Sequence, residues 1–443
     1  MASTYLTRTP SSGGNRKTFT ISAWFKKCKL SSNQILVQAA TDGSTRSQIT
    51  LRSDDMLEFY SENGGVQKIN VRTNRVLRDT NAWYHVVLAV DTTQATASNR
   101  VKIYINGTQE TSLHTAVYGD QNYDTQFNHT VAHTIGRRDA YSDQYFDGYQ
   151  SHFSLVDGTA LTPTTFGQTD STSGIWKFKS PSGVTWGTNG VHLKFENSAA
   201  LGTDSSGQSN TYTVNGNLKQ ALDTPSNVYC TMNPLSTTQN FNLSNGNNTF
   251  GAAADNKYIT GNLGGDSEAA STGYYFEYKV NANNLGNSGE GFRVGVKSVE
   301  NIFASDNDWY GLQETASDLI YEKTNGSSTT DTNIGSASNG DVVMIAWGKG
   351  GKIWMGVNGV WVDSGNPSSG SGEQYSGLTG VYAPFIMCSL TNGMNGSSMN
   401  FGNGFFGTTA ITSAGSNGNG SLFEYDVPSG YYALNTKNIN TYG

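Results

Sequence analysis

The sequence predicts an all-β protein made of two β-sandwich domains in series. Its 443 residues exceed what one ordinary hydrophobic core organises, and 52 glycines against 8 prolines indicate many tight turns. The 23 tyrosines and 19 phenylalanines argue against disorder, because disordered chains have few aromatic residues. Short alternating runs bounded by Gly, Asn, Asp or Ser recur along the whole chain, which is the pattern of strands separated by turns.

Strands in the first half are predicted at residues 18–25, 83–90 and 101–105. The last of these runs into Asn106-Gly107, a dipeptide that suits the type I′ turn of a hairpin. The polar stretch at 196–250 favours a linker, and we place the domain boundary near Pro225, with domains at 1–222 and 223–443.

The second half repeats this pattern. Residues 342–347 and 353–357 are expected to form a hairpin, Asn358-Gly359 to turn the chain again, and 364–377 to form a long loop. Alternation at residues 274–280 predicts one face with Tyr275, Glu277 and Lys279, and an opposite face with Tyr274, Phe276, Tyr278 and Val280.

The distribution of charge limits the classes of partner. Residues 1–222 carry 20 Lys and Arg against 17 Asp and Glu, and residues 223–443 carry 8 against 18. Neither half has the basic stripe that nucleic-acid binding needs. No run of 18 apolar residues predicts a membrane span, and the first residues lack the apolar core of a secretion signal. We therefore expect neither nucleic acid nor membrane insertion, and synthesis in the cytoplasm without a signal peptide.

Cysteine and histidine show no metal-binding spacing. Cys28, Cys230 and Cys388 stand far apart, without a Cys-x-x-Cys pair, and are predicted to be buried thiols of a chain that folds in a reducing compartment. The six histidines are scattered. The sequence therefore predicts no cofactor, apart from the calcium considered below.

Both halves resemble known families with a concanavalin A-like fold. The first half resembles laminin G-like and pentraxin-like jelly rolls through residues 19–24, 83–87, 101–107, 134–137 and 146–161. The second half resembles SPRY domains through residues 274–280, 294–296, 340–343, 354–361, 384–386 and 400–402. This resemblance implies two concanavalin A-like β-sandwich (jelly-roll) domains in tandem.

The tandem is similar to tail-fibre-like and other virion-surface proteins of marine bacteriophages. Residues 223–227 (DTPSN) and 425–434 (YDVPSGYYAL) carry this similarity. It implies a homo-oligomer on the virion surface that contacts other virion proteins and host-surface glycans. The chain starts almost at the first domain, so both a tail fibre and a head decoration remain open, as does a purely structural connector.

Two groups of residues are candidates for glycan binding, because sugar sites combine aromatic faces with amides and carboxylates. The second half offers Asp306, Asp308, Trp309 and Tyr310. The first half offers Tyr118, Asn122, Tyr123, Tyr141 and Tyr145. Two other interpretations stay open: Trp309 and Tyr310 begin a strand and point inward, or these residues dock a neighbouring subunit.

Calcium binding is a further hypothesis. Asp139, Asp143 and Asp147 place three carboxylates within nine residues, and the laminin G-like and pentraxin resemblance implies calcium at a sandwich rim. Asp120, Asn122 and Asp124 form a second such set. Ordinary turns also use Asp and Asn, so a purely structural loop is the alternative.

A glycan hydrolase is not expected. In Glu424-Tyr425-Asp426, the nearest approach to a Glu-x-Asp-x-x-Glu strand, Ser429 stands where the third acid would be. Glu58 and Glu62 share a strand face but are ~13 Å apart, beyond the ~5–9.5 Å of glycosidase carboxylates. The sequence therefore predicts a non-catalytic binding protein.

Overall fold

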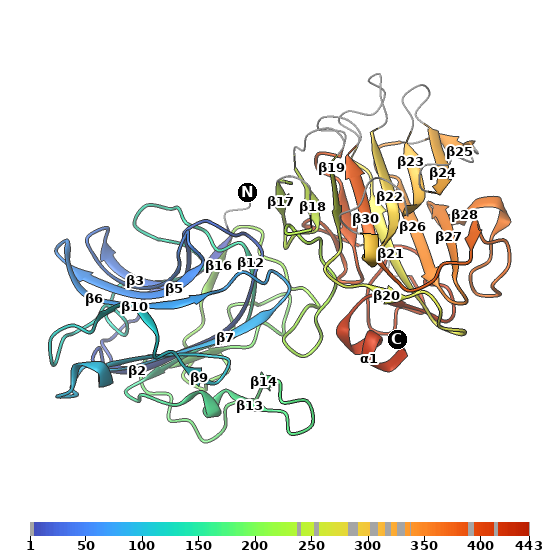
Figure 1. The fold of residues 1–443 in the computed structure, drawn as a ribbon. Helices are drawn as coiled ribbons and strands as arrows, with labels where there is room; N and C mark the ends of the chain where they lie inside the picture. Colours follow the sequence, from blue (N-terminus) through green and yellow to red (C-terminus); the bar gives the residue numbers. More distant parts are fainter. Residues whose placement is uncertain are drawn as a thin grey trace. The chain divides into compact units, whose positions relative to one another are not determined.

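The structure is a computed structural model that describes residues 4–236, 241–251, 257–281, 291–301, 309–314, 320–325, 333–336, 338–388, 394–411 and 415–442. The chain divides into two compact units, unit 1 with residues 1–220 and unit 2 with residues 221–443. Strands dominate the regular structure of both units (Figure 1). The predicted all-β fold is confirmed.

In the described part of unit 1, two antiparallel sheets form the sandwich and a short hairpin lies beside them. The eight-stranded sheet has the order β10 (Leu113–Val117), β6 (Val66–Val76), β5 (Met56–Asn63), β4 (Thr45–Leu51), β3 (Gln34–Asp42), β11 (Ala132–Ile135), β1 (Tyr5–Arg8), β16 (Thr213–Asn215). The six-stranded sheet has the order β15 (Val191–Leu193), β12 (Gly148–Asp157), β2 (Thr18–Lys27), β7 (Trp83–Asp91), β8 (Val101–Ile105), β9 (Thr108–Gln109). The hairpin pairs β13 (Gly167–Thr169) with β14 (Trp176–Phe178). Single 3₁₀ turns span Ala97–Asn99 and Pro163–Thr165.

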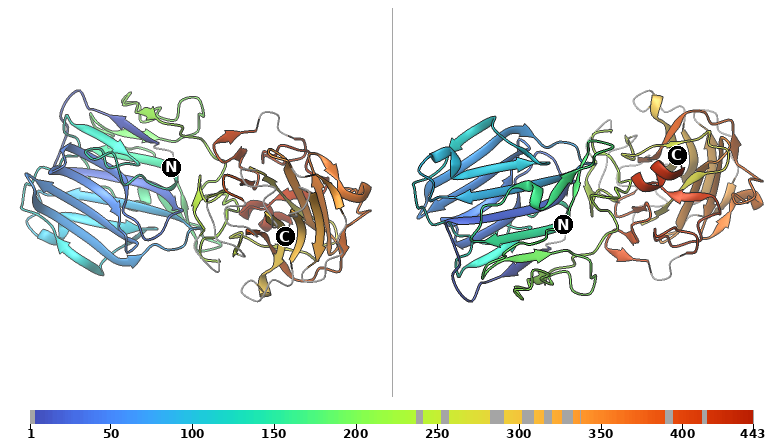
Figure 2. Two further views of the ribbon diagram at one scale, coloured as in Figure 1. Left: turned by 90° about the horizontal axis from the view of Figure 1, so that it is seen from above. Right: turned by 90° about the horizontal axis from the view of Figure 1, so that it is seen from below.

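The core of unit 1 lies between these two sheets, which Figure 2 shows from above and below. Alternate residues of each strand enter it, among them Phe19 and Ile21 of β2 and Phe59 of β5. At the β8–β9 turn, Asn106 and Gly107 have φ values of 48° and 81°, as the predicted type I′ turn requires.

Two buried histidines accept hydrogen bonds from obligatory donors. The Trp176 indole N–H donates to His85 Nδ1 at 2.9 Å, so the His85 proton sits on Nε2, which contacts Ser22 Oγ at 2.8 Å. The backbone N–H of Asn128 donates to His133 Nε2 at 3.0 Å, so the other ring nitrogen carries the proton. Burial lowers the pKa of His85 to about 3 and that of His133 to about 4. Both imidazoles are therefore neutral at neutral pH.

Unit 2 is a second sandwich in its described residues. Its nine-stranded sheet has the order β17 (Leu243–Ser244), β18 (Thr249–Phe250), β31 (Ser398–Asn400), β21 (Gly273–Lys279), β26 (Val342–Gly348), β27 (Lys352–Val357), β28 (Val360–Trp361), with β29 (Tyr375–Ser376) on β27 and β34 (Tyr431–Ala433) parallel to β21. Its seven-stranded sheet has the order β19 (Lys257–Thr260), β30 (Val381–Cys388), β22 (Phe292–Ser298), β23 (Trp309–Glu314), β24 (Ile320–Asn325), β25 (Asn333–Ser336), with β20 (Gly265–Asp266) on β30. The remaining elements are the pair β32 (Phe405–Phe406) and β33 (Thr409–Ala410), 3₁₀ turns at Val299–Asn301 and Val362–Ser364, and helix α1 (Thr436–Tyr442).

Unit 2 buries apolar side chains on both faces of its nine-stranded sheet. The inner face packs against the seven-stranded sheet and includes Tyr274, Phe276, Tyr278 and Val280, the face that the alternation predicts. The outer face contributes Tyr275, Met344 and Trp354 to a separate cluster. The chain that precedes β34 covers this cluster with Phe423 and Val427, and β34 adds Tyr431 and Ala433 from within the sheet.

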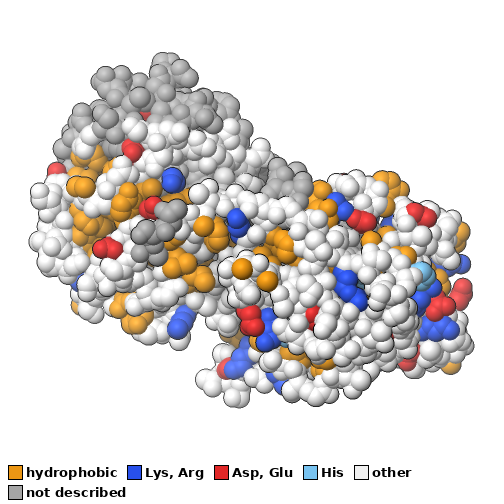
Figure 3. Space-filling model, turned by 180° about the vertical axis from the view of Figure 1, so that it is seen from behind, with side chains coloured by type: hydrophobic (Ala, Val, Ile, Leu, Met, Phe, Trp, Pro, Cys, Tyr) orange, Lys and Arg blue, Asp and Glu red, His pale blue; other side chains and the backbone are white. Residues whose placement is uncertain are grey.

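Few charges lie on the surface. The face drawn in Figure 3 is mostly uncharged polar side chains and backbone, in keeping with a charged fraction of 14%. In the described part of the chain, no helix has the length and apolar character needed to cross a membrane. Cys28, Cys230 and Cys388 are buried, as predicted for their side chains.

Candidate functional site

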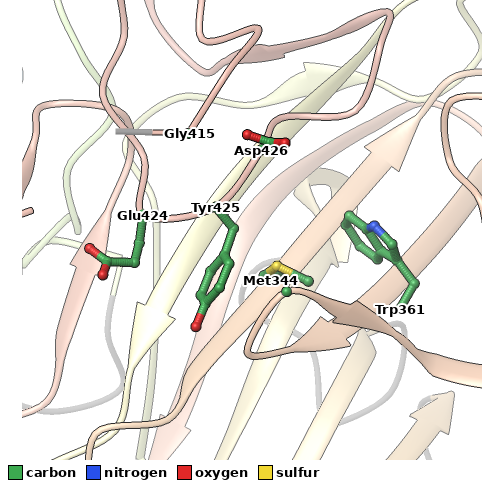
Figure 4. Close-up of a pocket in the computed structure, with 7 residues that line it drawn as sticks. Met344, Trp361, Gly415, Glu424, Tyr425 and Asp426 are labelled. Carbon is green, nitrogen blue, oxygen red and sulfur yellow. The ribbon is translucent and has the colours of Figure 1, made fainter. Parts of the chain in front are cut away.

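An open pocket of about 360 Å³ lies on unit 2, where the 415–434 segment meets the edge of the nine-stranded sheet. Met344 of β26 lies between the rings of Tyr425 and Trp361 in the close-up of Figure 4. Trp361 belongs to β28, the last described strand on that side of the sheet, and its half-buried ring packs against the outer-face cluster, 6.4 Å from the Tyr275 ring between centroids. The lining residues are Met344, Gly359, Trp361, Gly415, Glu424, Tyr425 and Asp426.

A type I′ turn shapes one side of the pocket. Asn358 and Gly359 have φ values of 51° and 83°, so the predicted turn between β27 and β28 is confirmed. A Cβ on Gly359 would lie 2.9 Å from the Tyr425 ring. Glycine therefore permits both the turn and the close approach of this ring.

A buried carboxylate lies beneath the pocket wall. Glu277 of β21 is 0% exposed and accepts the backbone N–H of Tyr425 at 2.8 Å and that of Glu424 at 2.9 Å. The Tyr275 hydroxyl donates to it at 3.0 Å and Asn400 Nδ2 at 3.2 Å. Burial raises the pKa of Glu277 to about 7, although all four hydrogen bonds favour the ionised form.

The two acidic side chains of the pocket do not converge. Figure 4 shows Glu424 and Asp426 on different sides of Tyr425. Asp426 is exposed and accepts the Ser416 N–H at 2.6 Å, which lowers the pKa of its carboxyl. Ionised Asp426 is a hydrogen-bond acceptor rather than a proton donor. The pocket therefore combines two aromatic faces with carboxylates that accept hydrogen bonds.

The second predicted glycan group is only partly described. Asp306 and Asp308 lie outside the described residues. The prediction of an exposed Trp309 platform is wrong, because this indole is 1% exposed and packs on Phe385 at 5.6 Å between ring centroids. Tyr310 is half-buried beside Tyr375 at 5.3 Å. The two rings lie on opposite faces of the seven-stranded sheet: Tyr310 packs against the core between the sheets, as the inward-pointing alternative anticipates, whereas Trp309 is buried in a separate cluster with Tyr258, Phe385 and Met387.

The first predicted glycan group is mostly occupied with packing. Tyr118 and Tyr123 are half-buried against the core, and the Tyr123 hydroxyl lies 3.0 Å from Ser61 Oγ. Tyr145 is half-buried, with its ring 6.3 Å from that of Tyr5. Asn122 is exposed in a left-handed turn with φ of 67°. Tyr141 is the most open of the set, at 57% exposure.

The predicted calcium loop is held by arginines instead. Asp139 pairs with Arg137, and Asp143 accepts Arg138 Nε at 2.6 Å. The N–H of Asp147 donates to Gln34 Oε1 at 2.8 Å, which ties this turn to β3. No group of three or more His, Cys, Asp or Glu within the described ranges is arranged to hold a metal ion. Two of the three carboxylates therefore already neutralise guanidinium groups, which favours the structural-loop alternative for these residues.

The two glutamates of β5, Glu58 and Glu62, also form ion pairs with arginines. Glu62 lies 2.6 Å from Arg46, and Glu58 lies 3.5 Å from Arg52. Both carboxylates are nearly buried, with whole-residue exposures of 3% for Glu58 and 7% for Glu62. Burial raises the pKa of Glu58, while Arg52 opposes that shift. These ion pairs give the two acids a structural role on the outer face of the sheet.

Sequence reasoning missed Trp361 and Tyr425 as site residues. In the sequence analysis, Trp361 stands only within the SPRY-like run 354–361, and Tyr425 stands only between two acids and at the start of the run 425–434. A usable signal was the Asn358-Gly359 turn, since a strand that follows such a turn and finds no further partner is an edge strand.

Comparison with known proteins gives a match for the first unit. Residues 2–165 match the model of the concanavalin A-like lectin/glucanases superfamily. This confirms the concanavalin A-like domain predicted for the first half, and the two β-sandwiches agree with tandem jelly rolls. The search of curated proteins finds no match.

Three solved structures are among those that the chain matches. The SPRY domain of human HERC1 is 16% identical and covers 38% of this chain and 96% of its own, with a TM-score of 0.28. Domains LG4-5 of the mouse laminin alpha1 chain are 10% identical and cover 89% and 85%, with a TM-score of 0.28. The Ruminococcus gnavus sialidase CBM40 bound to alpha2,3 sialyllactose is 12% identical and covers 34% and 80%, with a TM-score of 0.27.

Proposed function

We propose that this protein is a non-catalytic carbohydrate-binding protein, and that the pocket of unit 2 holds a sugar ring. The observation that carries the proposal is the open pocket with Trp361 and Tyr425 as aromatic walls and Asp426 as an ionised acceptor. The polarised C–H groups of a sugar face favour the negative face of an aromatic ring, and sugar hydroxyls donate to carboxylates. The lectin superfamily match of unit 1 supports the same class of ligand.

The proposal excludes turnover on chemical grounds. Glycoside hydrolysis needs an acid that protonates the leaving oxygen and a second carboxylate facing it across the bond. Glu277 has a pKa of about 7, which would suit such an acid. Its carboxylate is buried under Glu424 and Tyr425 and bonded to four donors. Hydrolysis of a bound oligosaccharide that Glu424→Gln abolishes would contradict this proposal.

Binding should depend on the two aromatic walls. We expect Trp361→Ala and Tyr425→Ala each to weaken glycan binding about tenfold, since an aromatic contact contributes about 0.5–1.5 kcal/mol beyond its buried area. A glycan array screened with the full chain would supply a ligand, and titration calorimetry would measure the variants. Tyr442→Ala removes an exposed tyrosine of helix α1, outside the pocket lining, and serves as the matched control. A blank array, or equal losses in all three variants, would count against the pocket.

We further propose that the protein is displayed on a virion surface, where its ligand is a host-surface glycan. This part rests on the resemblance of residues 223–227 and 425–434 to marine bacteriophage proteins, together with the homo-oligomer and virion partners that the resemblance implies. Immunogold labelling of the particle tests it. Label at the tail tips would support host recognition, label over the head would favour the structural decoration role, and particles without label would contradict both.

A further inference from the structure

The charged groups around the unit 2 pocket have one sign. Glu424 and Asp426 line it, and none of the described residues of its lining is Lys, Arg or His. Asp341 adds a third carboxylate beside the pocket, because Asn358, in the turn that forms one side, donates from Nδ2 to Asp341 Oδ1 at 2.8 Å. A ligand in the pocket therefore meets negative charge both from the lining and from the turn beside it.

The positive charges of unit 2 are few and lie elsewhere on the sheet. Unit 2 has 8 Lys and Arg against 18 Asp and Glu. The Lys279 ammonium lies over the ring of Phe406, at 5.3 Å from its centroid, and Phe406 follows β31, the neighbour of β21 on the side away from β28. Lys349 and Lys352 lie at the turn between β26 and β27, ~16 Å along the strand from Met344 of the lining. That distance is roughly twice the Debye length at physiological ionic strength, so these ammonium groups offset the carboxylates little.

Two aromatic rings complete the lining. Trp361 and Tyr425 are half-buried, and Figure 4 shows Met344 between them. The face of an aromatic ring is negative and attracts a cation that lies within about 6 Å of the ring centre. Burial raises the pKa of the Tyr425 hydroxyl, and the charges of Glu424 and Asp341 raise it further, so this ring lies in a negative field. The rings and the carboxylates therefore favour the same kind of ligand, one with a positive charge.

An ammonium group on a sugar matches both parts of this lining. It carries three N–H donors for the carboxylate oxygens, and a charge-assisted hydrogen bond is about twice as strong as a neutral one. The C–H groups of the sugar ring can still pack on an aromatic face. An acidic sugar would instead place its own carboxylate beside Glu424 and Asp426, with no cation among the described lining residues to pair with it.

We propose that the unit 2 pocket selects sugars with a free, protonated amino group and rejects acidic sugars. The sugar part rests on the function proposed above. The selection of positive charge concerns the pocket itself, and it can be measured with a cation that is not a sugar.

The main test compares methyl glucosaminide with methyl N-acetylglucosaminide on the full chain. The two probes share one ring and differ by an acetyl group, which removes the charge that the amine carries at pH 6. We expect titration calorimetry to show about fivefold tighter binding of the amine, and about fivefold weaker binding of methyl glucuronide than of methyl glucoside. Both differences should shrink in about 0.5 M salt. Equal affinities for the amine and its acetylated form would overturn the inference.

Charge-removing variants test which residues select the ligand. Asp426→Asn and Glu424→Gln keep the shape of the side chain, and each should reduce the preference for the amine about twofold. Glu373→Gln is the matched control, because the Glu373 carboxylate lies outside the lining and pairs with Lys352 Nζ at 3.0 Å. It should leave the preference unchanged. A preference that persists in both lining variants would contradict the assignment to these carboxylates.

Tetramethylammonium separates this inference from the proposed function. If it binds, Asp426→Asn weakens that binding, and no glycoside or array glycan binds, then charge selection stands and the proposed function fails. If glycosides bind with equal affinity whatever their charge, the inference fails and the proposed function stands. If neither tetramethylammonium nor any glycoside binds, both fail.

Discussion

Acidification from pH 7 to pH 5 is expected to destabilise unit 1 by about 2 kcal/mol from each of His85 and His133, and His152 and His192, whose pKa values are also lowered to about 4, add to this loss. The unfolded chain protonates histidine below about pH 6.5. In the folded chain, His133 takes up a proton only near pH 4 and His85 only near pH 3. The stabilisation is thus complete above pH 6.5 and is lost as the pH falls through that window. Its cause is burial, which disfavours the charged imidazolium, and Trp176 and Asn128 in addition direct donors at the ring nitrogens that would take the proton.

Peptide-resolved hydrogen exchange across a urea series would measure this loss in each unit of the full chain. Unit 2 is an internal control, because all six histidines lie in unit 1. It should instead gain stability on acidification, since the pKa of Glu277 is raised to about 7. His133→Gln keeps an acceptor and a donor but no titration, and should reduce the loss by about 2 kcal/mol. A free energy of unfolding for unit 1 that is unchanged between pH 7 and pH 5 would contradict the assignment.

Replacing Trp354 by alanine is expected to destabilise unit 2 by about 3–5 kcal/mol, the usual cost of truncating a buried Trp. Its side chain is 0% exposed and sits on the outer face of the nine-stranded sheet, at 6.0 Å between ring centroids from Tyr431 of the covering segment. The indole N–H donates to the Ser371 carbonyl at 3.0 Å and so also holds the 366–372 loop. The loss of the Trp354 side chain should therefore loosen the covering segment, residues 415–434, as well as destabilise the core.

The matched control is Trp354→Phe. It keeps most of the packing and removes the hydrogen bond to Ser371, so we expect a loss of about 1 kcal/mol. Denaturant unfolding with hydrogen exchange of peptides from residues 415–434 would measure both variants. Similar losses for alanine and phenylalanine would show that the hydrogen bond, rather than the packing, holds this layer.

The predictions made from the sequence agreed best with the structure where they depend on residues that are neighbours in the chain. Alternation at residues 274–280 correctly separated Tyr274, Phe276 and Tyr278 from Tyr275 and Glu277, because successive side chains of a strand must point to opposite faces. The Asn-Gly turns were also predicted from a local signal, because few residues adopt a positive φ at low cost.

Candidate sites were harder to predict, because exposure depends on distant segments. Trp309 has the polar neighbours of a surface aromatic in the sequence, yet Phe385 covers it from a strand more than 70 residues away. Asp139 and Asp143 have calcium-like spacing, and only their side-chain directions show that Arg137 and Arg138 occupy them.

The sequence by itself determined the all-β class, the paired-sheet architecture, the strand faces and the hairpin turns of this protein. These follow from the period of two along a strand and from the conformations that Gly and Asn permit. Only the tertiary structure decided that the outer face of a sheet is covered by residues 415–434, that Trp361 and Tyr425 form one pocket, and that Glu277 lies buried beneath it. Alternation says which side chains leave the core, but what then covers them depends on segments that meet only when the chain folds.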